Sequence, residues 1–330
     1  MQISVFVPHQ GVIEAITPPY RTFRTANDFL KVSGKKSMFE VEYVGLTEYV
    51  SAAGGEYMIK TDRLLKNVQN TDLLVIPPTF GNPEAGIAAN AEAIPYFKAL
   101  HRKGSSLASL CAGAFLLAET GLLNGRKCST HWAHIAAFKA RNPQVEVEDG
   151  AVLTEHGNIY TSGGANSLWN LLLYLVEKFS DRETAIMLSK YFSIDIGRDS
   201  QSQFAIFKGQ RKHDDPGIQK VQDYIERNYD GKISVENLAD LLLVGRRTFE
   251  RRFKEATNNT PLEYVQRVRV EAAKKCFEVS RKNVTDVMYD VGYTDNKAFR
   301  DVFKKVTGLT PIEYRNKFAR PVLMGMRTDD

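Results

Sequence analysis

The sequence predicts two domains of different fold class. The first is an α/β sandwich of the flavodoxin-like type with a mostly parallel sheet. The second is an all-α domain of two helix-turn-helix units. Three observations support this: strand-like and helix-like segments alternate through the N-terminal part, only helical patterns follow residue 216, and one helical segment occurs twice. We expect the domains at residues 1–207 and 217–330, joined by a polar linker at 208–216.

The N-terminal part carries the strand signals. Strand-like runs lie at residues 3–8, 39–46, 72–78 and 105–110. Helices are expected at 92–104, from Cys111 onward, and at 166–179, where apolar residues on all sides indicate a buried helix. The turn signals Asp149-Gly150 and His156-Gly157 predict a hairpin over 145–164. Strands that alternate with helices indicate a parallel sheet with helices packed on it.

The C-terminal part shows only helical periodicity. The helices we expect span residues 218–229, 235–243, 246–257, 261–279, 285–291, 296–306 and 311–318. Ser234 is the N-cap of the second of these helices. Gly245 and Gly292 fall between paired helices, where a helix-turn-helix needs a tight turn.

A repeat lies within these helices. Residues 247–264 and 297–314 align at a constant offset of 50, with eight of 18 positions identical. Two similar modules therefore present two basic helices to a partner. Duplex DNA is the partner that suits such a pair, because its major groove recurs about every 34 Å.

The net charge of +5 lies entirely on the helical part. Residues 1–216 carry 22 basic and 22 acidic side chains, whereas residues 217–330 carry 22 basic and 17 acidic ones. A solvated surface would explain a small excess, but its location on the repeat favours a polyanion as partner.

The repeated helices divide into an apolar and a charged face. Phe249, Phe253, Phe299 and Phe303 recur at i, i+4, so we expect them in the core. The opposite faces carry the candidate DNA-binding residues Arg246, Arg247, Glu250 and Arg251, and Asn296, Lys297, Arg300 and Lys304. Arg and Asn can read base edges bidentately, while Lys more often holds phosphate. Any one of these residues alone could equally be a solvated surface residue.

The C-terminal third resembles the AraC-type DNA-binding domain. The matching segments are VENLADLLLVGRRTFERRFKEATNNTPLEYV (235–265) and VTDVMYDVGYTDNKAFRDVFKKVTGLTPIEYR (284–315). The resemblance implies two helix-turn-helix units on one face, joined by a long helix. Here that helix would span residues 261–279, or about 27 Å.

A second resemblance involves Cys111. It follows a strand-like run in S-L-A-S-L-C-A-G-A-F-L-L-A (106–118) and stands at a helix start, which lowers the pKa of a thiol. With C-S-T-H-W (128–132) and Y-T-S-G-G-A-N-S (160–167), this resembles the nucleophile elbow of ThiJ/PfpI domains, which are class I glutamine-amidotransferase-like. The resemblance spans about residues 1–195 and implies His131 as partner of the cysteine. The alternative is that Cys111 is a small buried residue at a tight turn.

Two departures from that family argue against catalysis. Arg21 stands where family enzymes often carry an acid beside the cysteine, and it cannot act as a general acid or base near neutral pH. Pro78, in I-P-P-T (76–79), has no N–H to donate to an oxyanion. We therefore expect Arg21, Cys111, His131 and Ser162 to form a ligand or redox-sensing pocket, with Cys111 and His131 as vestigial catalytic residues and Arg21 favouring the thiolate.

These observations predict a transcription regulator that is not an enzyme. Its expected partners are promoter DNA, a small-molecule effector, a second copy of the chain and RNA polymerase, with no metal or cofactor. The chain has no run of 18 apolar residues, no signal-peptide pattern at its start, and only three scattered cysteines, so we expect a cytoplasmic protein with no membrane partner. The alternative is a cysteine amidase or hydratase of the ThiJ/PfpI type that carries a DNA-binding domain. A purely structural DNA-bending role would not need the neutral α/β domain.

Overall fold

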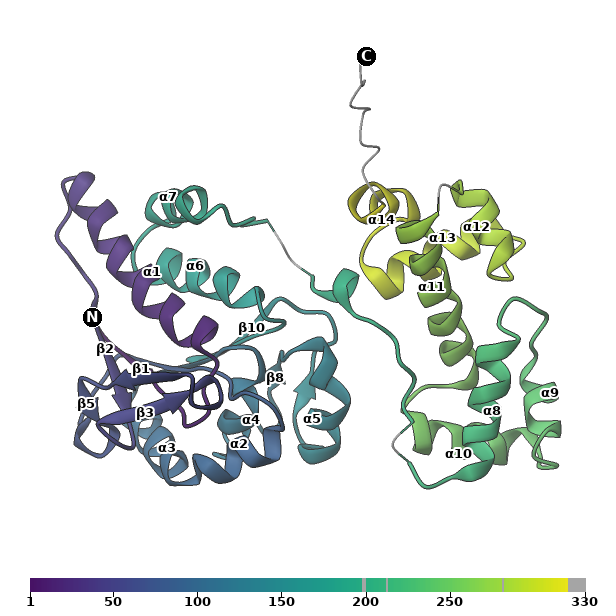
Figure 1. The fold of residues 1–330 in the computed structure, drawn as a ribbon, viewed down its shortest axis with the longest axis horizontal. Coiled ribbons are helices and arrows are strands. Elements are labelled where there is room, and N and C mark those ends of the chain that lie inside the picture. Colours follow the sequence, from purple (N-terminus) through teal and green to yellow (C-terminus); the bar gives the residue numbers. More distant parts are fainter. Residues whose placement is uncertain (198–199, 212, 281, 320–330) are drawn as a thin grey trace, which may run out of the picture. The chain divides into compact units, whose positions relative to one another are not determined.

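The computed structural model describes residues 1–197, 200–211, 213–280 and 282–319. The chain divides into two compact units, Met1–Gln201 and Ser202–Asp330 (Figure 1). The first unit is α/β with a mostly parallel sheet and the second is helical, as the sequence predicts. Among the described residues, no helix is long and apolar enough to cross a membrane.

A seven-stranded sheet organises the first unit, in the order β10-β11-β7-β6-β1-β2-β5. Neighbouring strands of this sheet pair in parallel, except for the antiparallel hairpin β10–β11. The strands are β1 (Gln2–Phe6), β2 (Glu40–Gly45), β5 (Arg63–Leu64), β6 (Leu73–Ile76), β7 (Ser106–Ser109), β10 (Leu153–His156) and β11 (Ile159–Ser162). The hairpin expected over residues 145–164 is therefore confirmed only for residues 153–162, where β10 pairs with β11.

Four further strands lie outside this sheet. β9 (Glu146–Val147) pairs in parallel with β8 (Lys127–Cys128), so Asp149-Gly150 does not close a hairpin. β3 (Tyr49–Ala52) and β4 (Tyr57–Lys60) form a separate antiparallel hairpin that the sequence did not predict.

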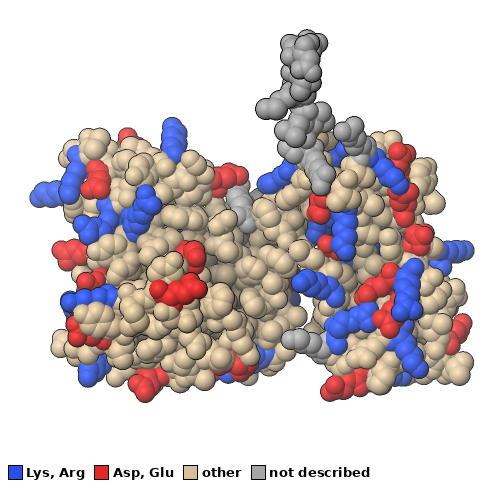
Figure 2. Space-filling model, viewed as in Figure 1, with Lys and Arg blue, Asp and Glu red and all other residues tan. Residues whose placement is uncertain are grey.

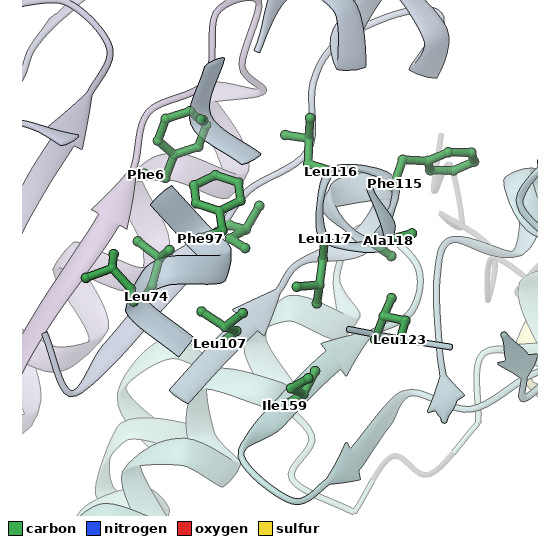
Figure 3. Packing of buried hydrophobic residues seen from close by; sticks show 14 of the residues in the cluster. Phe6, Leu74, Phe97, Leu107, Phe115, Leu116, Leu117, Ala118, Leu123 and Ile159 are labelled. Carbon is green, nitrogen blue, oxygen red and sulfur yellow. The ribbon is translucent and has the colours of Figure 1, made fainter. Parts of the chain in front are cut away.

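Helices cover the sheet over two cores. On one side α1 (Ile13–Val32), α6 (Ser167–Phe179) and α7 (Arg182–Phe192) pack over alternate strand residues such as Ile3 and Val5. The other core includes α2 (Pro83–Ala89), α3 (Ile94–Arg102), α4 (Ala114–Ala118) and Phe138 of α5 (Ile135–Arg141). Figure 3 shows the latter core, where the rings of Phe6 and Phe97 meet edge to face at 5.0 Å.

Seven α-helices lie in the described part of the second unit. They are α8 (Pro216–Arg227), α9 (Val235–Asp240), α10 (Arg246–Thr257), α11 (Pro261–Val279), α12 (Val284–Asp290), α13 (Asn296–Thr307) and α14 (Pro311–Phe318). All seven expected helices are present. α11 runs between α10 at one end and α13 at the other (Figure 1). Tyr264 and Val265 of α11 belong to one core with α8–α10, and Ala273 and Phe277 belong to a second core with α12–α14.

The repeated Thr-Pro-x-Glu sequence builds the same helix start twice. Thr260 Oγ1 accepts a hydrogen bond from Glu263 N–H, and the Glu263 carboxylate accepts one from Thr260 N–H. Thr310 and Glu313 make the same two bonds at α14. Each pair is a capping box behind a proline in the first turn, which explains why the repeat keeps these residue types.

The turns of the two modules differ, which corrects one expectation. Gly292 has φ +81° in the turn between α12 and α13, as a tight turn requires. Gly245 instead is the N-cap of α10 at φ −66°. Leu243 takes the left-handed conformation in that module, at φ +53°.

The residues expected as a linker lie on the helical unit. We call residues 202–211 and 213–215 the strap; Lys212 lies outside the described residues. Lys274 Nζ donates to the Ala205 carbonyl, and Phe207 packs against Tyr264 with ring centroids 5.1 Å apart. At the end of the strap Asp215 caps α8 and binds Arg252 of α10 at 2.8 Å. The first unit therefore ends at Gln201, before the expected boundary at 207.

Candidate nucleic-acid interface and elbow site

The helices α10 and α13 are anchored in the same way. Phe249 and Phe253 are fully buried, with Phe253 edge to face on Tyr264 at 5.4 Å. Phe299 and Phe303 are also fully buried, with Phe303 on Tyr314 at 5.5 Å. The expectation that these four phenylalanines are core residues is confirmed. The outer face of each helix is therefore held in a defined orientation.

The candidate DNA-binding residues lie on these outer faces. Arg246, Arg247 and Arg251 of α10 and Asn296, Lys297, Arg300 and Lys304 of α13 are exposed, and Glu250 is half-buried. In Figure 2 the visible face of the helical unit shows Lys and Arg interspersed with Asp and Glu rather than in one basic patch. Ion pairs on this face therefore determine which Lys and Arg side chains are available to a partner.

The two helices differ in this pairing. On α10, Arg246 binds Glu236 at 2.6 Å and Glu250 at 3.0 Å, and Arg251 binds Glu255 at 3.0 Å. Within the described ranges, no carboxylate pairs with the three basic candidates of α13 (Lys297, Arg300 and Lys304). Arg246 and Arg251 of α10 must therefore leave their carboxylates to bind an anion. The basic candidates of α13 can bind one without first breaking such a pair.

In the first unit, Cys111 occupies a strained turn directly after β7 and Leu110. Its φ of +54° is left-handed, which is uncommon for a residue other than glycine. The Cys111 N–H donates to Ser162 Oγ at 3.2 Å, and Thr130 Oγ1 donates to the Cys111 carbonyl at 3.1 Å. A Cβ on Gly113 would lie 2.3 Å from the Ile76 carbonyl oxygen, so the helix after the turn needs glycine to approach β6.

The thiol of Cys111 is not poised as a thiolate. The residue keeps some exposed surface, yet burial raises the pKa of its thiol to about 11, and a backbone hydrogen bond from Ala112 only partly opposes this. Desolvation outweighs the effect of the helix start. Burial at this position therefore opposes the thiolate that the helix start or Arg21 would favour.

His131 lies at the start of the 3₁₀ turn Trp132–His134. Its Nδ1 accepts the Ala133 N–H at 3.1 Å, and burial together with the nearby His134 lowers its pKa. With Nδ1 accepting, the neutral ring carries its proton on Nε2 and is a donor there rather than a base. Within the described residues, no hydrogen bond joins the His131 ring to the Cys111 thiol.

Residues 13–178, half of the chain, match the model of the DJ-1/PfpI family. The chain belongs to the DJ-1/PfpI family. Residues 238–317 match a helix-turn-helix domain model, and curated relatives that match this chain include HTH-type transcriptional regulators. Both resemblances read from the sequence motifs are confirmed.

Relatives of this DJ-1/PfpI chain include regulators from Pseudomonas aeruginosa. It is 25% identical to the HTH-type transcriptional regulator GbdR over 236 residues, which is 71% of this chain and 64% of GbdR. It is 24% identical to the HTH-type transcriptional regulator CdhR over 273 residues, 81% of this chain and 80% of CdhR. The match thus spans slightly less than two thirds of the length of GbdR.

Solved structures share the fold at low identity. An AraC family transcriptional regulator from Pseudomonas putida superposes with a TM-score of 0.50 at 19% identity, covering 58% of this chain and 98% of that one. A ThiJ/PfpI family protein from Pseudomonas syringae has a TM-score of 0.50 at 19% identity, covering 61% and 78%.

Arg21 of the DJ-1/PfpI unit does not lie where the motif comparison put it. It is exposed on α1, and its guanidinium lies 5.2 Å from the centroid of the Phe192 ring of α7. The next two residues of α1, Thr22 and Phe23, are buried, so the helix period turns Arg21 outward. Ser162, in contrast, is buried, and its Oγ accepts the Cys111 N–H.

Three residues of this region were missed by the sequence analysis: Thr130, Gly164 and Gln201. The Gln201 carboxamide is bonded to the backbone of the other two. The Gly-Gly pair within Y-T-S-G-G was a usable signal for a close approach at this point, but nothing in the sequence marks Gln201. No group of three His, Cys, Asp or Glu among the described residues is placed to hold a metal.

Proposed function

We propose that the chain is a sequence-specific DNA-binding transcription regulator in which α10 and α13 enter successive major grooves. The observation that carries the proposal is the duplicated module: two helices with the same buried phenylalanine pair and the same capping box behind them, each with an exposed polar and charged face. α11, about 27 Å long, spaces them on the scale of one DNA turn, about 34 Å.

The residues of the two faces divide between base and phosphate contacts. Arg246, Arg300 and Asn296 suit base edges, because guanidinium and carboxamide groups bind guanine and adenine bidentately. Lys297, Lys304 and the remaining arginines suit phosphates. Glu250 would accept from cytosine or hold Arg246 in position.

We further propose that the DJ-1/PfpI unit senses a small ligand and forms the homodimer, in a cytoplasmic protein. Support for sensing comes from the buried hydrogen bonds around Cys111, Ser162 and Thr130, which preserve an elbow without an activated thiolate. RNA polymerase is the further partner that a regulator of promoters would need.

Salt-dependent binding of the full chain to duplex DNA tests the proposal. Each phosphate neutralised releases counterions, so the log–log slope should be near −0.9 per contact. A genomic footprint then identifies the operator, and protection should fall in two stretches about 10 bp apart. An affinity unchanged between about 50 and 200 mM salt would contradict the proposal.

The left-handed elbow at Cys111 supports one other candidate, a cysteine amidase or hydratase with a DNA-binding appendage. The raised pKa of the thiol and the committed Nδ1 of His131 argue against it. Turnover of amide or aldehyde substrates that disappears in Cys111→Ala would establish the enzyme.

A further inference from the structure

The side chain of Gln201 is fully buried in a cradle of backbone groups beside the elbow. Its Oε1 accepts the Gly164 N–H at 2.6 Å, and its Nε2 donates to the carbonyls of Thr130 at 2.9 Å and Ala151 at 3.1 Å. We call these three backbone groups the cradle. They satisfy the carbonyl oxygen and both N–H bonds of the carboxamide.

The cradle selects one functional group. It offers a single donor and two acceptors, which a primary carboxamide complements. A carboxylate would turn an oxygen toward two carbonyl oxygens, and a tertiary amide has no N–H to donate. Steric fit agrees, because a Cβ on Gly163 would lie 2.4 Å from the Gln201 Nε2, and one on Gly164 would lie 3.0 Å from Oε1.

The cradle adjoins the residues of the proposed sensing pocket. Thr130, whose carbonyl belongs to the cradle, also donates to the Cys111 carbonyl. A Cβ on Gly164 would come within 3.7 Å of the His131 ring and 3.5 Å of Trp132. His131 and Trp132 therefore lie close to Gly164, which supplies the N–H of the cradle.

Gln201 also lies at the boundary between the two units of the chain. Its own N–H donates to the Gly150 carbonyl at 2.7 Å, and it is the last residue of the first unit. The strap begins at the next residue and ends at Asp215, bound to Arg252 of α10. Release of Gln201 would act on the chain immediately before the strap, whose Asp215 is bonded to α10.

We propose that the cradle is a binding site for a primary carboxamide, that Gln201 fills it in cis, and that a soluble primary carboxamide displacing Gln201 is an effector of this chain. The effector role rests on the proposed function. Because the tethered Gln201 has a high effective concentration at the cradle, a free ligand must compete with it. By linkage, a ligand that favours the released state changes DNA affinity, and operator DNA changes ligand affinity by the same factor.

The test uses the full chain, with acetamide as probe and N,N-dimethylacetamide as a control that lacks N–H donors. Hydrogen exchange of the Gly164 amide is compared in the wild type, in Gln201→Ala, and in Gln69→Ala, a substitution of an exposed glutamine. We expect Gln201→Ala to lose protection at Gly164 at least tenfold, and acetamide to restore it. In the wild type the Gly164 amide should stay protected at every acetamide concentration, because an acetamide that displaced Gln201 would accept the same N–H. Dimethylacetamide and Gln69→Ala should have no effect.

Operator affinity is the second measurement. We expect Gln201→Ala to change it by roughly five-fold or more, in the direction that saturating acetamide produces in the wild type. If Gln201→Ala loses protection at Gly164 but binds the operator with unchanged affinity, the carboxamide site stands and its effector role is overturned. If no variant binds DNA, the proposed function is overturned. Hydrogen exchange at Gly164 would still test whether the cradle binds a carboxamide.

Unchanged protection in Gln201→Ala, with no response to acetamide, would overturn the carboxamide site itself. Both tryptophans, Trp132 and Trp169, lie in the first unit, so tryptophan fluorescence reports whether that unit is folded in each variant. Should Gln201→Ala unfold, Gln201→Met keeps the bulk of the side chain without its polar atoms. Loss of Gly164 protection in a folded Gln201→Met supports the cradle, and wild-type protection there refutes it.

Discussion

Three residues with left-handed backbone show how different physical requirements can lead to the same conformation. Cys111 holds φ +54° because the turn after β7 must place its N–H on Ser162. Gly292 holds φ +81° where no side chain fits. Leu243 holds φ +53° with its side chain 94% exposed, so packing does not offset the strain. Such strain costs about 1–2 kcal/mol for a residue with a Cβ.

Alkylation of Cys111 should depend steeply on pH. Because burial raises the pKa of its thiol to about 11, the thiolate is scarce at neutral pH, and labelling by iodoacetamide should rise about tenfold per pH unit up to pH 10. The measurement is the mass-spectrometric labelling rate of Cys111 from pH 7 to 10, with Cys276 of the helical unit as internal comparison. Rapid labelling of Cys111 at pH 7 would show that its thiol is activated after all.

Gly292→Ala should destabilise the helical unit by at least about 2 kcal/mol. The new Cβ would add left-handed strain and would lie 2.5 Å from the Asp230 carbonyl oxygen, a backbone atom that cannot move away cheaply. Gly245→Ser is the matched control: its Cβ meets open space, and a serine N-cap should stabilise α10 slightly. Guanidinium unfolding followed by circular dichroism reports the helices of both units, and tryptophan fluorescence reports the first unit alone, so the difference between the two transitions gives the helical unit. Equal midpoints for the two variants would refute the steric argument.

At the scale of elements, duplication has preserved the anchoring of α10 and α13 but not their surfaces. Each helix has two buried phenylalanines and a tyrosine from the helix that follows. The tyrosine hydroxyls also donate to carboxylates, Tyr264 to Glu226 and Tyr314 to Glu278, both at 2.6 Å. Because the cores agree while the exposed residues differ, the two helices can hold equivalent positions and read different bases.

Arg300→Ala should cost more binding energy on the operator than Arg246→Ala. A bidentate arginine contributes about 1–3 kcal/mol to one base position. Arg246 must first leave Glu236 and Glu250, which offsets part of its gain, whereas Arg300 has no carboxylate to leave among the described residues. The measurement is affinity for operator variants with each base changed in turn, against random DNA. If both substitutions weaken operator and random DNA equally, these arginines bind phosphate and our assignment to bases is wrong.

At the scale of the molecule, the strap is part of the helical unit rather than a tether. It supplies a carbonyl to the buried Lys274, an aromatic ring to Tyr264 and a carboxylate to Arg252. The same segment continues directly from Gln201, the last residue of the first unit.

A fragment starting at residue 217 should be less stable than one starting at residue 202. Loss of the strap leaves Lys274 without its carbonyl partner and exposes the Tyr264 ring, at a cost of at least about 2 kcal/mol. For a domain of this size the melting temperature should fall by roughly 8 °C or more. Lys208→Ala in the longer fragment is the control, because Lys208 is exposed. Equal melting temperatures for the two fragments would mean that the strap contributes nothing.

The sequence was sufficient for whatever depends on local pattern. The 50-residue repeat, the i, i+4 phenylalanines and the Thr-Pro-x-Glu starts located the seven helices and their buried faces, because helix periodicity and capping are local. The helix α1 was not predicted, since Pro18 and Pro19 interrupt its pattern. The placement of Arg21 failed because a motif comparison does not resolve which way a helical residue faces.

Tertiary structure alone decided how distant residues combine. Burial rather than a neighbouring cation determines the pKa of Cys111, and burial is a property of the packed unit. The bonds of Gln201 to Thr130, Ala151 and Gly164 join residues between 37 and 71 positions apart, which no local pattern can indicate. The same holds for the strap: its polar residues from 208 onward suggest a linker until its partners on α8, α10 and α11 are seen. Sequence therefore determined the family and the helices of the second unit, while side-chain contacts across the fold determined the chemistry of the sites.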